Sequence, residues 1–257
     1  MLDGKVHWHN GELITPQTPY QPQQRVYYYR EVASEPHIPF EEDILFQDEQ
    51  LLVAYKPPFL PVTPGGIYIN ECLQNRLRDK TGIADLQALH RLDRATAGLI
   101  LFSVQAKNRK LYHQLFNARE IHKTYQAVAH INETKVQTKQ RWEVKNRLIK
   151  STPRFLMEIT NGPANSHSII ECVKKSGPQA LFELSPITGK THQLRVHMQS
   201  LGMPILNDRY YPALKAQQDD NYSQPLQLLA KSLNFIDPLS LQVRSFSCQT
   251  NLTLSPN

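Results

Sequence analysis

A cluster of reactive side chains near the middle of the chain leads directly into an apolar segment. An imidazole, a carboxylate and two guanidiniums come together in His90, Arg91, Asp93 and Arg94. Residues 99–104 follow as a short run rich in branched side chains, which predicts a buried strand. A loop that feeds a central strand is where a scaffold usually holds reactive groups. The alternative is a surface loop whose arginines simply pair with its aspartate.

A second polar cluster lies about a hundred residues later. Residues 188–197 read Thr-Gly-Lys-Thr-His-Gln-Leu-Arg-Val-His. The spacing of apolar side chains predicts a helix over 191–201, with Leu194, Met198 and Leu201 on its inner face. The polar residues of this run would then surround the start of that helix.

The ten histidines raise the question of a metal site. His192 and His197 are five positions apart on the expected helix, whereas zinc ligands on one helix face are four apart. His90 with Asp93 would supply only two ligands. We therefore predict no metal site and favour structural or RNA-contacting roles for the histidines. The sequence also contains no Gly-x-Gly-x-x-Gly, P-loop or Gly-x-Ser-x-Gly motif.

Three blocks of the chain, in this order and at workable spacing, resemble the RluA-type RNA pseudouridine synthases. They are Lys56-Pro57 at the end of a predicted strand, His-Arg-Leu-Asp at residues 90–93, and residues 188–197. The resemblance runs from about residue 44 to residue 235. The second and third blocks are long and distinctive, so a chance agreement is disfavoured.

The resemblance implies that the protein isomerises uridine to pseudouridine in structured ribosomal or transfer RNA. The N1–C1′ bond breaks, the base turns, and a C5–C1′ bond forms; the base is never released, so no metal or external cofactor is expected. Asp93 matches the essential carboxylate, which either adds to the sugar or removes a sugar proton. We expect Arg195 to form a bidentate pair with Asp93 and keep it ionised.

The resemblance also implies roles for residues around Asp93. Tyr125 would pack on the uracil and handle the late proton at C5, although it could also be an ordinary strand aromatic. Arg91 would fill the space left by an extruded base, a step that single-stranded RNA loops make easier. Leu194 would form part of the apolar wall. Two departures, Ala97 for the usual Ser and Asn207 for the usual Gly before an Asp, remove no reactive group.

The formal net charge of +6 suits a polyanionic partner. Residues 139–154 are the most basic stretch and could contact phosphates, or they could form a charged hairpin in solvent. We expect RNA-contacting residues among seven basic side chains: Lys56, Arg94, Lys123, Lys145, Arg147, Lys190 and His192.

Residues 1–40 differ in composition from the rest. An Asn-Gly pair at residues 10–11 predicts a hairpin with a type I′ turn that places Trp8 opposite Leu13. A Pro/Gln-rich piece and a basic, aromatic strand at 25–30 follow. This arrangement resembles part of an S4-type RNA-binding fold without its basic helices. The alternative is a small β-appendage that packs on the main domain.

Residues 41–257 are predicted to form the catalytic domain. The expected fold class is α+β, a mixed and largely antiparallel sheet with flanking helices, and this topology comes from the resemblance. Helices are predicted over 70–80 and 106–119, the second with Leu111 on its core-facing stripe. The tail after Pro238 is expected to be loose.

Composition bounds the location of the protein. The cysteines Cys72, Cys172 and Cys248 are far apart and show no paired spacing, which favours a reduced, intracellular protein. No apolar run is long enough to cross a bilayer and no signal peptide is expected. We therefore predict a cytoplasmic protein that binds RNA and no membrane, and a monomer because no apolar stripe is left over.

Two other functions remain open at this point. One is a catalytically silent RNA-binding protein with the same fold, although such a protein would not need Asp93, Tyr125 and Arg195 together. The other is a hydrolase with Asp93 as its nucleophile. A hydrolase would need a second acid, and none lies near Asp93 in the sequence.

Overall fold

The computed structural model describes residues 6–28, 34–216 and 219–254. The chain divides into two compact units, Met1–Pro36 and His37–Asn257. Each unit has its own sheet and is described by itself. No helix in the described residues is long and apolar enough to cross a membrane.

The small unit holds an antiparallel pair, β1 (Val6–Trp8) and β2 (Val26–Tyr28). The hairpin that follows β1 differs from the predicted one. His7 lies opposite Leu13, and the Trp8 N–H donates to the Glu12 carbonyl at 2.8 Å. The predicted pairing of Trp8 with Leu13 was therefore wrong by one residue. Only Gly11 in this turn has a positive φ, of 87°, whereas a type I′ turn needs two such residues.

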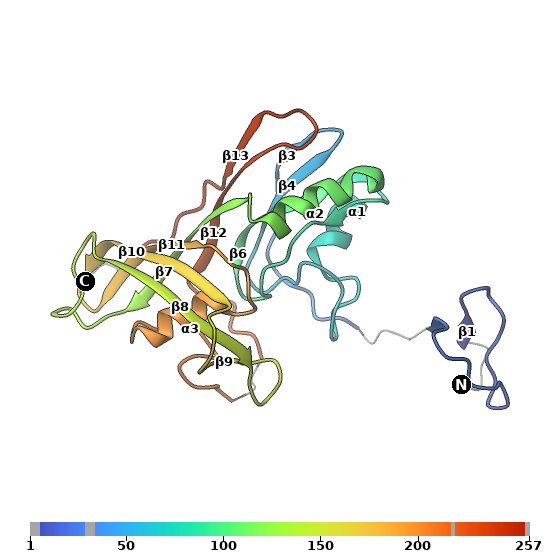
Figure 1. Ribbon diagram of the computed structural model, residues 1–257, viewed down its shortest axis with the longest axis horizontal. Coiled ribbons are helices and arrows are strands. Elements are labelled where there is room, and N and C mark those ends of the chain that lie inside the picture. Colours follow the sequence, from blue (N-terminus) through green and yellow to red (C-terminus); the bar gives the residue numbers. More distant parts are fainter. Residues whose placement is uncertain (1–5, 29–33, 217–218, 255–257) are drawn as a thin grey trace. The chain divides into compact units, whose positions relative to one another are not determined.

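The large unit is built on one mixed sheet (Figure 1). Its strands are β3 Asp43–Gln47, β4 Leu51–Lys56, β5 Gln87–Ala88, β6 Ala97–Ser103, β7 His122–His130, β8 Arg141–Lys150, β9 Met157–Thr160, β10 Ser166–Ser176, β11 Gln179–Pro186, β12 Leu228–Ile236 and β13 Val243–Ser247. The main path runs β3-β4-β6-β12-β7-β11-β10-β8-β9, with β13 paired to β12 and β5 to β6. Among the described strands, only β6 and β12 pair in parallel. The α+β class with a largely antiparallel sheet is confirmed.

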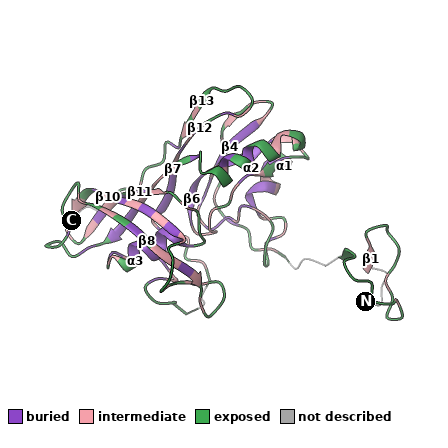
Figure 2. Cartoon of the chain, viewed as in Figure 1, coloured by how far each residue is buried: buried purple, intermediate pink, exposed green. Residues whose placement is uncertain are grey.

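Strand β6 is buried along its whole length, as the apolar run predicted. Alternate residues of β4 and β6 belong to two separate core clusters, one containing the helix α1 (Leu73–Thr81) and the other α2 (Arg109–Ala118). Because neighbouring strand residues point to opposite faces, these two helices cover opposite faces of the sheet. Figure 2 shows the resulting burial of β4 and β6. This three-layer packing holds the loop before β6 in place.

The other half of the sheet has a different cover. Helix α3 (Gln193–Ser200) lies near β9 and β10 (Figure 1). Its Leu194 and Met198 enter a core cluster with side chains of β7, β10 and β11. Leu201 is only partly buried at the edge of this cluster. The predicted helix and its inner face are thus confirmed, with a start two residues later than expected.

A close approach between β6 and β12 aligns the two halves. Gly98 pairs with Ala230, and Ala230 on its other side pairs with Tyr125 of β7. Gly98 has a φ of 119°, and a Cβ at this position would lie 2.3 Å from the Ala230 carbonyl oxygen. Only glycine fits this contact. This side-by-side pairing of Gly98, Ala230 and Tyr125 brings the Asp93 loop, which precedes β6, next to Tyr125.

Two sequence predictions about the core were wrong. Leu111 is 37% exposed, and the buried residues of α2 are Tyr112 and Leu115. The C-terminal tail is not loose in its described part, because Val243–Ser247 forms β13 and Cys248 is buried. An alternating pattern of exposure along β13 hides its strand character from a search for apolar runs.

Candidate active site

Asp93 and Arg195 form an ion pair between the Asp93 loop and helix α3. The Arg195 Nη1 donates to Asp93 Oδ2 at 3.2 Å. The Arg195 side chain is 3% exposed, whereas Asp93 is 26% exposed and so can be reached from outside. The expected pair is present, but through one nitrogen only.

The bidentate partner of Arg195 is Asp208. Its oxygens accept from Arg195 Nε at 2.8 Å and from Nη2 at 2.7 Å. The expected bidentate contact with Asp93 was therefore wrong. Burial lowers the pKa of Arg195, but the hydrogen bonds and charges of Asp208 and Asp93 outweigh it, and the net pKa is raised. The guanidinium is held rigid and charged beside the Asp93 carboxylate.

The residues from Asn207 to Tyr211 hold Asp208 and Arg195 in place. Asn207 has a φ of 63°, in the left-handed region that glycine and asparagine tolerate best. The backbone N–H groups of Tyr210 and Tyr211 then donate to Asp208 Oδ1. Both aromatic rings also face the guanidinium of Arg195, at 4.7 and 5.4 Å from its Cζ. The Asn that replaces the family's usual Gly thus keeps the required turn.

His192 lies beside the Asp93 carboxylate and is almost fully buried. It is 9% exposed, its Nε2 lies 3.8 Å from Asp93 Oδ2, and its Nδ1 lies 3.0 Å from the Tyr211 hydroxyl. Burial lowers the pKa of His192. The helix start turns this ring inward, and the RNA contact expected for it stays a prediction.

Tyr125 and Leu194 line the same side of the centre. Leu194 is 7% exposed and belongs to the core cluster against which Tyr125 packs. Burial, followed by the negative charge of Asp93, raises the pKa of Tyr125. Its phenol is therefore protonated at neutral pH. Arg91, in contrast, is exposed.

Lys56 is fully buried, so its ammonium is not exposed to RNA in the free protein. Its Nζ donates to the carbonyl oxygens of Pro57 at 2.8 Å, Leu60 at 2.8 Å and Arg94 at 3.0 Å. Burial lowers the pKa of Lys56 well below its ordinary value, although the charge of Asp93 acts in the opposite direction. Three carbonyl acceptors match the three N–H groups of an ammonium, so the charged form fits the site. Lys56 ties the end of β4 to the Asp93 loop.

Two more of the basic candidates, Arg94 and Lys123, are only partly exposed. Arg94 forms two hydrogen bonds of 2.7 Å with Asp220. Lys123 is half-buried, which lowers its pKa, and its Nζ ends beside Gly189. Arg94 therefore connects the Asp93 loop to Asp220.

The remaining basic candidates lie at the surface. Lys145 is 55% exposed and pairs with Glu143 at 2.6 Å. Arg147 is half-buried beside Gly162, and Lys190 is exposed. In the described part of the chain, no three His, Cys, Asp or Glu side chains are grouped so as to hold a metal ion.

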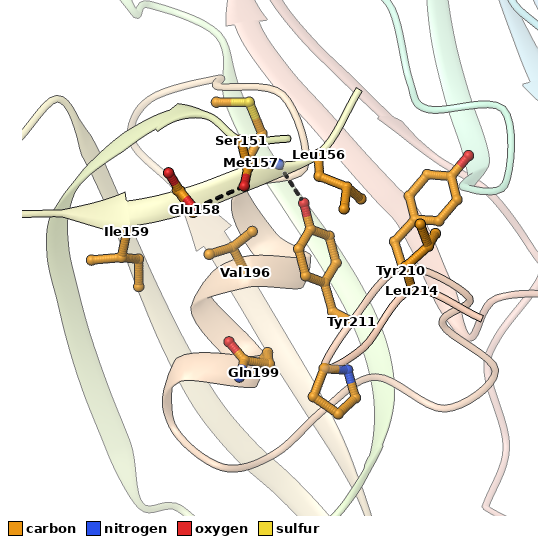
Figure 3. A pocket seen from close by; sticks show the side chains of 11 residues that line it. Ser151, Leu156, Met157, Glu158, Ile159, Val196, Gln199, Tyr210, Tyr211 and Leu214 are labelled. Atoms are coloured by element: carbon orange, nitrogen blue, oxygen red, sulfur yellow. Dashed lines mark hydrogen bonds between the residues drawn. The ribbon is translucent and has the colours of Figure 1, made fainter. Parts of the chain in front are cut away.

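A pocket of about 270 Å³ borders this centre (Figure 3). Leu156 and Met157 form one wall, Val196 of α3 another, and Tyr210 with Tyr211 the side next to Arg195. Figure 3 shows the Tyr211 hydroxyl pointing at the Met157 backbone, whose N–H donates to it at 2.9 Å. Tyr211 thus connects the pocket to His192.

Comparison with known proteins decides what this centre belongs to. The profile of the RNA pseudouridylate synthase family matches residues 50–200. The chain belongs to this family, and it is of the RluA type. The Dual-specificity RNA pseudouridine synthase RluA of Vibrio cholerae is 34% identical over 208 residues, which cover 79% of this chain and 80% of that protein. The RluA of Haemophilus influenzae is 32% identical over 81% of this chain and 93% of its own length.

Solved structures agree at the level of the fold. Human RNA Pseudouridylate Synthase Domain Containing 1 superposes with a TM-score of 0.68 at 20% identity, covering 84% of this chain and 86% of that one. Human RNA Pseudouridylate Synthase Domain Containing 4 gives a TM-score of 0.61 at 24% identity. The pseudouridine synthase fold that the resemblance implied is confirmed.

Sequence reasoning missed three residues of this synthase's centre. Asp208 had one signal, its place after Asn207, where the family has an Asp. Tyr211 and Asp220 lie in a stretch that reads as a polar loop, and no local pattern marks them. Their roles come from contacts across the fold and not from spacing.

Proposed function

We propose that the protein isomerises specific uridines in ribosomal or transfer RNA loops to pseudouridine, with Asp93 as the catalytic carboxylate. The observation that carries this proposal is the anchored pair: Asp93 is accessible, while its partner Arg195 is buried and locked by Asp208. A fixed guanidinium places a positive charge beside this carboxylate, and both routes to glycosidic bond cleavage use a carboxylate. The relatives named for dual-specificity RNA pseudouridine synthesis support an RNA substrate.

The neighbouring residues would serve the same reaction. The Tyr125 ring and Leu194 would pack on the uracil. Because its pKa is raised, Tyr125 would act as a neutral phenol, which disfavours its phenolate as the base for the C5 proton. Exposed Arg91 would take the place of the extruded base in the RNA stack. Lys123, Lys145, Arg147 and Lys190 would contact phosphates.

The small unit would add a further RNA contact. Tyr27 and Tyr28 of β2 are 42% and 68% exposed, and exposed aromatic rings can stack on unpaired bases. Its likeness to an S4-type fold, the monomeric state and the cytoplasmic location stay predictions of the sequence.

Tritium release tests the reaction directly. RNA carrying 5-tritiated uridine loses its label when C5 bonds to C1′, so we would compare the wild type with Asp93→Asn on RNA from cells that lack this protein. We expect release by the wild type only, with RNA binding retained by both proteins. Binding without release by either would support the catalytically silent alternative. Free uracil in the products would support a hydrolase.

A further inference from the structure

Arg195 and His192 both face a single oxygen of Asp93, and only Arg195 lies within hydrogen-bond distance of it. Arg195 Nη1 lies 3.2 Å from Oδ2, and His192 Nε2 lies 3.8 Å from the same atom. Among the described residues, no hydrogen bond or ion pair involves Oδ1. The two carboxylate oxygens therefore have different surroundings before any RNA arrives.

The proton of His192 can be placed by counting donors. The Met157 N–H donates to the Tyr211 hydroxyl at 2.9 Å, so this oxygen already accepts one hydrogen bond. The Tyr211 hydroxyl hydrogen needs an acceptor of its own, because the residue is only 8% exposed. His192 Nδ1, at 3.0 Å, is that acceptor. A neutral imidazole whose Nδ1 accepts carries its hydrogen on Nε2, the atom that faces Asp93.

The backbone conformation and a neighbouring side chain fix the orientation of the His192 ring. His192 precedes α3 with a φ of 52°, a left-handed conformation that is uncommon for residues other than glycine. The Tyr210 ring lies 5.4 Å from the imidazole and limits its rotation. The charged groups that face His192 are Asp93, Arg195 and Asp208, and burial, the largest influence, lowers its pKa. The ring is thus neutral and fixed.

We propose that His192 is a positioning residue: with its hydrogen on Nε2, 3.8 Å from Oδ2 of Asp93, it supports electrostatically the oxygen that Arg195 holds by a hydrogen bond, so that Oδ1 is the oxygen presented to the ribose. Tyr211, itself held by the backbone of Met157, sets the tautomer. This inference rests on the proposed function, because it names the reacting oxygen of the same carboxylate. It adds a relay, Met157 to Tyr211 to His192, that extends from β9 to the reactive group.

The tautomer can be measured without any activity assay. Nitrogen-15 NMR of histidine-labelled protein distinguishes the protonated ring nitrogen, and the signal lost in His192→Gln identifies His192. At neutral pH we expect a neutral ring with the hydrogen on Nε2. A hydrogen on Nδ1, or a doubly protonated ring, would overturn the proposal. In Tyr211→Phe we expect the hydrogen to be shared between both nitrogens; an unchanged tautomer would remove Tyr211 from the relay.

Kinetics of two isosteres then separate positioning from RNA contact. The amide nitrogen of His192→Gln can reach the place of Nε2, whereas that of His192→Asn reaches only the place of Nδ1. We expect kcat to fall about fivefold in the first and about a hundredfold in the second, with KM unchanged in both. His130→Gln, at an exposed position, is the matched control. Equal losses in both variants, or losses confined to KM, would contradict the proposal.

The same experiment separates this inference from the proposed function. If the wild type releases no tritium, the synthase proposal fails while the NMR result still reports on the relay. If the wild type is active and both isosteres keep full kcat, the function stands and only the role of His192 is lost. Thermal unfolding of each variant shows whether a loss of rate reflects a loss of fold.

Discussion

Two basic regions of this protein satisfy their charges in opposite ways. Around Asp93 the guanidinium of Arg195 is almost fully buried and held by two carboxylates. On β8 the ammonium of Lys145 is more than half exposed and pairs with Glu143, which is itself 56% exposed. Exposed pairs of the second kind contribute little to stability, whereas breaking a buried pair is costly. The chemistry is therefore organised before RNA binds, and the surface charges stay free to exchange partners.

On the buried side of this comparison, we expect the largest effect from a substitution of Asp208. Asp208→Asn keeps the shape of the side chain but removes the charge that locks Arg195. We expect kcat to fall roughly a hundredfold and the free energy of unfolding to fall by about 3 kcal/mol, because a buried guanidinium loses its main partner. Tritium release and urea denaturation measure the two effects. The exposed Asp219→Asn is the control, and equal behaviour of the two variants would refute the anchoring role.

Lys56 tests whether a buried cation near the centre acts through the fold or through RNA. Lys56→Met leaves three carbonyl oxygens without their donor, so we expect a loss of about 2–4 kcal/mol in the free energy of unfolding. RNA affinity at a temperature where the variant is folded should not change. Exposed Lys107→Met should leave stability unaltered. A variant as stable as the wild type but weak in RNA binding would restore Lys56 as an RNA contact.

Sequence patterns predicted the elements whose signal is local. The apolar run before Val104 became β6, and the helical spacing of Leu194 and Met198 became α3. The family motifs also pointed to Asp93 and Arg195 as partners, which the structure brings within 3.2 Å.

The misses share a physical cause. Whether a cation is exposed depends on what covers it: Lys56 ends a strand, but a loop from the middle of the chain closes over it. The bidentate choice of Arg195 depends on the left-handed turn at Asn207, which no periodicity reveals. The hairpin at residues 10–11 has a bulged turn with one positive φ in place of the expected type I′ turn.

The protonation of Tyr125 gives a test with a smaller effect on the protein. Burial and the charge of Asp93 both disfavour the phenolate, so its pKa lies above the ordinary value of 10.0. As the pH rises through 10, the wild type and Tyr125→Phe should therefore gain tyrosinate absorbance equally. The pH profile of the wild-type rate should show no alkaline limb from this group in that range. Extra tyrosinate in the wild type below pH 10 would contradict this.

Substitutions of the basic residues on β8 should have the smallest effects on activity and stability. Lys145→Ala and Arg147→Ala should each weaken RNA binding a few-fold and reduce the slope of log affinity against log salt by about 0.7–0.9, because each removes one phosphate contact. The rate of conversion of bound RNA should not change, since neither residue contacts the Asp93 centre. Stability should also stay within about 0.5 kcal/mol of the wild type.

The matched control for these surface charges is a pair of lysines at the start of α2. Lys107, two residues before α2, and Lys110, in its first turn, are exposed and basic, and α2 packs on the β4–β6 half of the sheet, away from β8. If RNA follows β8, then Lys107→Ala and Lys110→Ala should leave the salt slope unchanged. Equal slopes for all four variants would instead mean that RNA senses only the net charge of +6. In that case the exposed residues of β8 would attract RNA without fixing its position on the protein. The target uridine would then be selected by the buried centre and the loops beside it.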